Sequence, residues 1–188
     1  YIDSVMEVTM ANVLIAYYSR DGENYRDGRI VDLAEGNTQV VAKKIRQITG
    51  GELFRIEPLH PYPADYHETT ELAQKELQDN ARPELSGPPC PVERYDIVYL
   101  GYPIWWGVMP MPVLTFLEKY DFSGKTVIPF CTHEGSGMGD SVSYIRRCCP
   151  GVRVLDGLAV YGSRCDRADQ AIRAWLQKTE SAMKVNGV

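Results

Sequence analysis

The sequence predicts an α/β protein in which helices cover both faces of a five-stranded parallel sheet. Apolar runs typical of strands buried on both faces recur along the chain. Each run is followed by a segment with helical periodicity. Because helices supply the right-handed crossovers that parallel strands need, this alternation favours a sheet between two helical layers.

Ten elements are expected, five strands alternating with five helices. The strands are placed at residues 12–18, 52–56, 95–101, 125–132 and 152–160, and the helices at 37–49, 64–80, 110–120, 140–149 and 166–178. Strand 12–18 is a continuous apolar run, and Asn37 or Thr38 is a suitable N-cap for the helix that a Gly-Gly pair then ends. Strand 52–56 alternates as an edge strand does, and helix 64–80 is polar and expected to lie exposed.

The second half of the chain follows the same pattern. Strand 95–101 is apolar throughout, and two prolines lie in the first turn of the next helix, where proline is favoured. Strand 125–132 leads into a glycine-rich loop, and an Asp-Ser pair caps the helix after it. Strand 152–160 is expected to be continuous, and the last helix turns Ala, Ile and Trp side chains inward.

The length of 188 residues fits a single domain, expected at residues 11–180. Residues 1–10 are interpreted as an N-terminal tail or a remnant of cloning, and residues 181–188 as a C-terminal tail. The first residues lack a basic region followed by an apolar stretch, so we expect no signal peptide, and Met10 is a natural candidate for the start.

Charge and cysteine usage argue against several classes of function. The chain has 25 acidic and 20 basic residues, a net charge of -5, and no Lys/Arg-rich stripe, which disfavours a nucleic-acid partner. No apolar run is long enough to cross a bilayer, so no membrane partner is expected. Five cysteines without a CxxC pair, with three histidines, suit neither a disulfide framework nor a metal site. Free thiols favour a cytoplasmic location.

Three loops that follow predicted strands carry the candidate functional residues. Parallel strands bring their carboxyl ends to one edge of the sheet, and ligands bind there. The first loop begins with Ser19-Arg20 and resumes at Gly36-Asn37-Thr38 after an insertion over residues 20–35. Glycine and hydroxyl residues at a helix N-terminus form an anion site, although these residues also serve as simple caps. The pattern is neither GxGxxG nor GxxxxGK[ST].

The second loop is Pro103-Ile104-Trp105-Trp106-Gly107, directly after a buried strand. Aromatic rings in a Pro/Gly-framed loop at a sheet end are well placed to stack on a flat aromatic ligand. The alternative is that both tryptophans pack on neighbouring helices. Adjacent residues in extended chain point in opposite directions, so one of the two is expected to face a ligand.

The third loop is Thr132-His133-Glu134-Gly135-Ser136-Gly137. Its glycines let the backbone approach a planar ligand and donate N–H groups to the polar edge of that ligand. His133 and Glu134 form a candidate catalytic acid–base pair. The alternatives are a flexible turn and a histidine that bonds only to backbone.

The order and placement of these loops resemble the flavodoxin family over about residues 12–177. Residues 18–20 with 36–38 are similar to the family's phosphate loop, here with a long insertion, and residues 101–107 are similar to its second flavin loop. Residues 132–137 are similar to the third loop of a bacterial subgroup. The resemblance implies a short-chain, three-layer flavodoxin-like sandwich with sheet order 2-1-3-4-5 and noncovalently bound FMN.

The resemblance also implies the position of each residue around FMN. The phosphate would be held by Ser19, Asn37 and Thr38, with Arg20 beside them. One side of the ring would be bordered by Pro103, Ile104, Trp105, Trp106 and Gly107. The other side would be bordered by Thr132, His133, Glu134, Gly135, Ser136 and Gly137. The insertion is expected to fold outward, anchored by Ile30, Val31 or Leu33, with Tyr25 near the flavin.

The function expected from this resemblance is electron transfer through FMN, to a redox partner protein or a small-molecule acceptor. A modest net charge leaves open an NAD(P)H-dependent FMN reductase of quinones or other small molecules. Such a reductase is also expected to form a homodimer. A third alternative, from a different class, is a non-redox module that binds a phosphorylated ligand.

Overall fold

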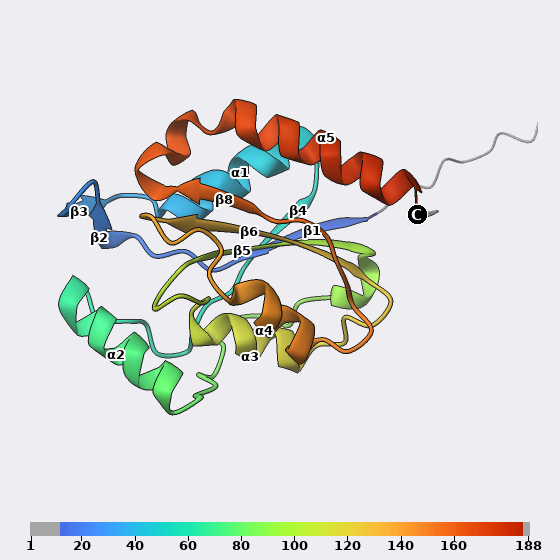
Figure 1. Cartoon of the computed structure of the whole chain (residues 1–188). Coiled ribbons are helices and arrows are strands. Elements are labelled where there is room, and N and C mark those ends of the chain that lie inside the picture. The colour runs from blue at the N-terminus through green and yellow to red at the C-terminus, as the bar shows by residue number, and fades with distance from the viewer. Residues whose placement is uncertain (1–11, 186–188) are drawn as a thin grey trace, which may run out of the picture.

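A parallel sheet lies between two layers of helices in the computed structural model, which describes residues 12–185 (Figure 1). The N-terminal tail expected at residues 1–10 lies outside the described residues. Helices α1 and α5 cover one face of the sheet, and α3 and α4 cover the other. Helix α2 stands apart, beyond the end of the sheet. The expected three-layer sandwich is confirmed.

The sheet has the strand order that the resemblance implies. Its strands are β1 (Val13–Tyr17), β4 (Glu52–Arg55), β5 (Ile97–Pro103), β6 (Thr126–His133), β7 (Arg153–Val154) and β8 (Leu158–Tyr161). All pairs are parallel, in the order β4-β1-β5-β6-β7, and β8 also pairs with β6. With β7 and β8 as two parts of the fifth strand, this is the order 2-1-3-4-5. Strands β5 and β6 are almost wholly buried, as apolar runs between two layers must be.

Residues 12–185 contain five α-helices, of which α5 follows the last strand. They are α1 (Asn37–Thr49), α2 (Tyr66–Gln78), α3 (Met111–Lys119), α4 (Ser141–Cys148) and α5 (Asp169–Val185), with 3₁₀ turns at Val92–Arg94 and Gly162–Arg167. Helix α1 buries Val41 and Ile45 against the sheet and ends at Gly50, whose φ of 70° is left-handed. Helix α2 is capped by Asp65, which accepts a hydrogen bond from the amide of Glu68 at 2.8 Å. No helix within residues 12–185 is both long and apolar enough to span a bilayer.

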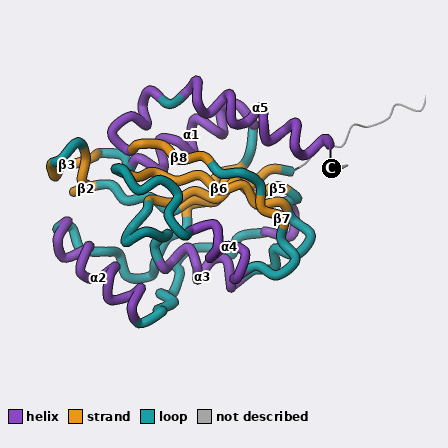
Figure 2. Tube along the Cα trace, viewed as in Figure 1, coloured by secondary structure: helices purple, strands orange, loops and turns teal. Residues whose placement is uncertain are grey.

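The fifth strand is broken, which corrects the expectation of one continuous strand over residues 152–160 (Figure 2). From Val127 to Phe130 strand β6 advances three residues, whereas its partner advances four, from Val154 to Leu158. Pro129 of β6 lies in this interval and has no N–H to donate to a ladder. The additional residue in the partner strand therefore forms a bulge beside this proline.

The insertion in the first loop forms a hairpin that was not predicted. Strand β2 (Gly22–Arg26) pairs antiparallel with β3 (Arg29–Leu33). Asp27 and Gly28 have φ angles of 50° and 82°, so the turn has two left-handed residues, as in the type I′ turns that favour Asp-Gly. The expected apolar anchor is wrong for Ile30, which is 41% exposed. Val31 and Leu33 are half-buried, and polar contacts add to the anchoring of the hairpin.

Helix α5 is longer than expected, because it runs to Val185 instead of ending near residue 178. Residues 181–185, expected to begin a tail, are helical and carry the buried side chain of Met183. Residues 186–188 lie outside the described part of the chain.

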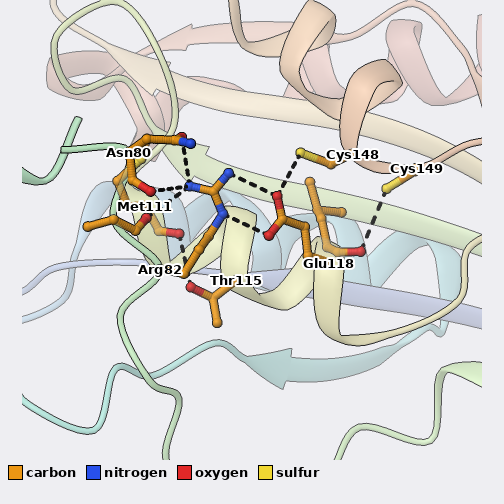
Figure 3. A network of polar contacts seen from close by, with 9 residues as sticks. Asn80, Arg82, Met111, Thr115, Glu118, Cys148 and Cys149 are labelled. Atoms are coloured by element: carbon orange, nitrogen blue, oxygen red, sulfur yellow. Dashed lines mark hydrogen bonds and ion pairs between the residues drawn. The ribbon is translucent and has the colours of Figure 1, made fainter. Parts of the chain in front are cut away.

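A polar network fastens the loop after α2 to helices α3 and α4 (Figure 3). The Arg82 guanidinium donates to both carboxylate oxygens of Glu118, at 2.8 and 2.9 Å, and to the carbonyl oxygen of Asn80 at 3.1 Å. This pairing lowers the pKa of Glu118. The Cys148 thiol donates to the same carboxylate, and burial raises the pKa of Cys149 to about 12. Both neighbouring cysteines are therefore poor nucleophiles and act in packing.

Candidate functional site

The three predicted loops meet at the carboxyl edge of the sheet. Pro103 pairs with Thr132, and His133 pairs with Tyr161, so the loops that follow these strands lie side by side. Between them is a hollow of about 130 Å³, called the loop hollow below. Ten of the residues predicted for the site line it: Ser19, Arg20, Asn37, Thr38, Pro103, Ile104, Trp105, Thr132, His133 and Glu134.

The N-terminus of α1 forms one end of the loop hollow. Its N-cap, Gly36, has no side chain with which to accept from the first amides of the helix. Ser19, which is buried, accepts a hydrogen bond from the Gln39 amide at 3.1 Å. The hydroxyls of Thr38 and Thr132 form a hydrogen bond of 2.8 Å across the hollow. Free amides, buried hydroxyls and the positive end of the helix dipole together suit an anionic group.

Two arginines lie beside this end of the hollow. Arg55, at the end of β4, donates to the Ser19 carbonyl oxygen at 3.1 Å and to the Gln39 side chain at 2.8 Å. Arg20 lines the hollow, but its guanidinium donates to the carbonyl oxygens of Glu23, Pro63 and Ala64. Arg20 therefore adds positive charge near the anion site while its hydrogen bonds go to the protein.

The two tryptophans have different surroundings. Trp105 is half-buried and packs edge-on against Tyr18 and Tyr62, with ring centroids 5.5 and 5.0 Å away. Trp106 is 49% exposed and donates its indole N–H to the Thr70 carbonyl oxygen at 2.9 Å. Trp105 alone lines the loop hollow, so it is the tryptophan that faces the predicted site.

His133 organises the third loop. Its Nδ1 accepts hydrogen bonds from the amides of Gly135 at 2.9 Å and Gly137 at 3.1 Å, so the proton of the neutral ring is on Nε2. The ring lies 4.4 Å from the ring of Tyr161, and only 9% of the residue is exposed. Burial lowers the pKa of His133, and the Glu134 carboxylate opposes part of that shift. The geometry suits a neutral loop organiser with one free N–H donor.

A pH dependence of stability follows from His133. Its pKa in the unfolded chain is close to the ordinary value of 6.5, and the folded value is lower. The unfolded state therefore binds more protons as the pH falls. The contribution of His133 to the free energy of unfolding is complete above about pH 6.5 and is lost progressively below it. We expect His133→Asn, which keeps an acceptor, to lose this component in urea titrations between pH 5 and 8. His60→Asn, at an exposed position, is the control, and equal pH profiles for wild type and His133→Asn would contradict the assignment.

The Glu134 carboxylate links the third loop to the hairpin turn and to the segment after β8. Its Oε1 accepts from the Ser163 amide at 2.8 Å, and its Oε2 accepts from the Asp27 amide at 3.3 Å. Gly162 leaves room for this arrangement, because a Cβ there would lie 2.9 Å from Glu134 Oε1 and 2.5 Å from Asn37 Nδ2. Both carboxylate oxygens thus accept hydrogen bonds from backbone amides, and the catalytic role of Glu134 stays a prediction.

Five predicted residues do not line the loop hollow, and one of them is Trp106, described above. Gly107 closes the turn of the tryptophan loop, and its carbonyl oxygen accepts from the Asp140 amide at 2.9 Å. Gly135, Ser136 and Gly137 curl around Nδ1 of His133. Their contribution to the site is to shape the loop.

Two other hollows adjoin the first. One of about 230 Å³ shares Arg20, Tyr66 and Trp105 with the loop hollow and extends between α2 and Trp106; we call it the α2 hollow. The other, of about 630 Å³, lies behind Ser19 and Arg20. It is lined by five acidic residues, Asp21, Glu23, Asp32, Glu57 and Asp65. Although it is the largest, its acidity disfavours an anion, so the anion site belongs to the loop hollow.

Several residues of the loop hollow were not predicted from the sequence. Asn24 comes from the hairpin, Tyr66 from the start of α2, and Gly162 from the end of β8. Gly162 had a signal, because the fifth strand ends at the same edge as the other loops. Asn24 and Tyr66 had none, because only the tertiary paths of the hairpin and of helix α2 bring them there. Within the described residues, no group of His, Cys, Asp and Glu side chains could hold a metal ion.

Comparison with known proteins places the chain in a family. The family model described as flavodoxin matches residues 31–179. A crystal structure from Bacteroides eggerthii, of a protein assigned as a flavoprotein, is 30% identical, with a TM-score of 0.69, over 89% of this chain and 96% of its own. The counterpart from Bacteroides uniformis is 29% identical, with a TM-score of 0.68, over 87% and 98% of the two chains.

A more distant structure contains a ligand. A flavoprotein from Lactobacillus acidophilus in complex with FMN has the same fold, with 24% identity, a TM-score of 0.60 and coverage of 84% of this chain and 97% of its own. No curated protein matches the sequence significantly. The family model covers well over half of the residues of the chain. The chain therefore belongs to the flavodoxin family.

Proposed function

We propose that the protein binds FMN noncovalently in the loop hollow and transfers electrons through it. The observation that carries this proposal is that one hollow combines an anion-binding end with an apolar, aromatic end. At one end are the α1 N-terminus and the hydroxyls of Ser19 and Thr38, which suit a phosphate. At the other end are Ile104 and Trp105, which suit a planar ring. Family membership and the FMN complex of the Lactobacillus acidophilus protein support the same ligand.

The residues present fit such a ligand. The loop hollow alone is smaller than the roughly 300–1,000 Å³ typical of small-molecule sites, and the adjoining α2 hollow extends it. Ser19, Asn37 and Thr38 would hold the phosphate, and Trp105 would shield the ring from water. His133 would offer its Nε2–H proton to the polar edge of the ring. Bound FMN supplies one- or two-electron transfer, and the protein supplies position and electrostatics.

The absorption spectrum of the purified protein tests this proposal. Flavin bands, with FMN identified by mass after release, are the expected result. If the protein is colourless, FMN should quench its tryptophan fluorescence with one-to-one stoichiometry, because Trp105 lies in the hollow. No bands and no quenching would contradict FMN binding and favour a module for another phosphorylated ligand.

A second candidate function is an NAD(P)H-dependent reductase of a quinone or another small molecule. The α2 hollow favours it, because Thr69, Ala73 and Trp106 line a largely apolar space beside the site proposed for the ring. A carrier that only docks on redox proteins needs no room for a second ligand beyond the part of this space that FMN occupies. Anaerobic mixing of the FMN-loaded protein with NADPH or NADH distinguishes the two functions, since rapid flavin bleaching is expected of the reductase alone. The homodimer predicted with a reductase is tested by sedimentation.

A further inference from the structure

We propose that the hairpin β2–β3 is a further wall of the cofactor site and that Glu134 is the positioning residue that holds it there. The proposal rests on the proposed binding of FMN. It assigns a role to the insertion over residues 20–35 and replaces the catalytic role that the sequence predicted for Glu134.

The hairpin contributes directly to the loop hollow. Asn24 and Tyr25 of β2 line it together with Thr38, Trp105 and His133. Asn24 is fixed within the hairpin, because its amide group donates to the carbonyl oxygens of Arg20 at 3.0 Å and Gly22 at 3.2 Å. Figure 1 shows the hairpin beyond the carboxyl edge of the sheet, next to the start of α1. A ligand in the hollow therefore has the hairpin as one of its neighbours.

The tip of the hairpin is tied to the far side of the hollow. The Glu134 carboxylate accepts from the Asp27 amide in the turn and from the Ser163 amide after β8. Arg26 donates to the Ser163 carbonyl oxygen at 3.1 Å and lies 3.7 Å from the Asp166 carboxylate. Glu134 is the member of this group that belongs to the third loop, so it joins the hairpin to a wall of the site.

The base of the hairpin is tied to the start of α2. Glu23 accepts a hydrogen bond from the Tyr66 amide at 2.7 Å, and the rings of Tyr25 and Tyr66 stack with centroids 6.3 Å apart. Arg20 donates to the carbonyl oxygens of Pro63 at 2.8 Å and Ala64 at 2.9 Å. With its tip on the third loop and its base on α2, the hairpin spans the hollow.

These polar ties carry the placement of the hairpin, because it buries little apolar surface. Tyr25 is 44% exposed and Ile30 is 41% exposed. A two-stranded hairpin alone is marginally stable in water, so its position depends on contacts with the rest of the chain. Removing Glu134 takes away the tie between the tip and the third loop, so the hairpin should loosen while the sheet and its helices stay folded. Bound FMN should then be released faster.

Two variants and one control test this role. Glu134→Ala removes both acceptors, whereas Glu134→Gln keeps one acceptor oxygen and loses the charge. Asp32→Asn removes a carboxylate from the exposed face of β3, away from the loop hollow, and is the matched control. The rate of FMN release is measured by the return of free-flavin fluorescence after dilution into excess scavenger apoprotein. We expect Glu134→Ala to release FMN at least about tenfold faster, Glu134→Gln to be intermediate, and Asp32→Asn to match the wild type.

Hydrogen exchange of the FMN-free protein is the second measurement. Amides of residues 22–33 should lose protection in Glu134→Ala, while those of β1, β5 and β6 keep theirs. Hydrogen exchange tests the role of Glu134 even if the wild type binds no FMN. Failure of the proposed function and failure of the Glu134 role are therefore distinguishable. Unchanged protection, or unchanged release from a wild type that does bind FMN, would overturn the proposal. General loss of protection would mean that Glu134 supports the whole fold, which also overturns it.

Discussion

Replacing Gly36 with alanine is expected to abolish FMN binding and to lower the free energy of unfolding by about 1–3 kcal/mol. Gly36 has φ and ψ of -66° and 148°, which alanine adopts freely, so the effect comes from space alone. A Cβ there would lie 2.6 Å from the Arg20 carbonyl oxygen and 2.8 Å from the Arg20 carbonyl carbon, and it would also strike the Ser19 hydroxyl. Backbone cannot move aside as a flexible side chain can, so the Ser19–Arg20 segment must separate from α1.

The consequence for binding follows from the same contact. Separation breaks the hydrogen bond between the Ser19 hydroxyl and the Gln39 amide and opens the anion site. Urea unfolding and FMN titration of the Gly36→Ala variant measure the two effects. Ala34→Ser, an exposed change two residues away, is the control and should leave both quantities unchanged. The double variant Ser19→Ala with Gly36→Ala should recover only part of the stability, because the clash with the Arg20 backbone remains. Wild-type FMN affinity in Gly36→Ala would place the phosphate elsewhere.

The fold and most of the site were predictable because both depend on local sequence patterns. Apolar runs such as residues 95–101 identify buried parallel strands, and parallel pairing then brings their carboxyl ends together. That geometry is enough to gather Thr38, Trp105 and Thr132 from distant parts of the sequence. The break in the fifth strand was predictable in principle from Pro129, but only once its pairing with residues 153–161 was known.

The roles of particular side chains could not be predicted in the same way. His133 and Glu134 stand next to each other and suggest acid–base chemistry by residue type. In the structure each is occupied by backbone amides, from Gly135 and Gly137 for His133, and from Asp27 and Ser163 for Glu134. The amides that reach His133 come from its own loop, whereas those that reach Glu134 are brought by tertiary paths that leave no periodic signal. The Asp-Gly turn at residues 27–28 was a local signal, and it would have identified the hairpin.

The tryptophan loop has a geometry that separates the roles of its two indoles. Trp105 and Val108 exchange backbone hydrogen bonds of 2.8 and 3.3 Å, which closes a two-residue turn. The central residues, Trp106 and Gly107, have φ angles of 55° and 81°. A left-handed conformation costs a bulky residue about 1–3 kcal/mol, and Asn-Gly is the usual solution for such a turn. Trp106 therefore occupies an unfavourable position, with its side chain in the α2 hollow.

Trp105→Ala and Trp106→Asn are accordingly expected to have opposite profiles. Trp105→Ala should lower the free energy of unfolding by about 2–3 kcal/mol, because it empties a half-buried site against Tyr18 and Tyr62. It should also weaken FMN binding at least about tenfold.

Trp106→Asn relieves the strained turn while losing the hydrogen bond to Thr70, so its stability should stay within about 1 kcal/mol of the wild type. Its FMN affinity should change little, whereas any reductase activity toward a ligand in the α2 hollow should fall. Urea unfolding, FMN titration and steady-state kinetics measure the three effects. A large loss of FMN affinity in Trp106→Asn with none in Trp105→Ala would reverse the assignment and place the ring against the exposed indole.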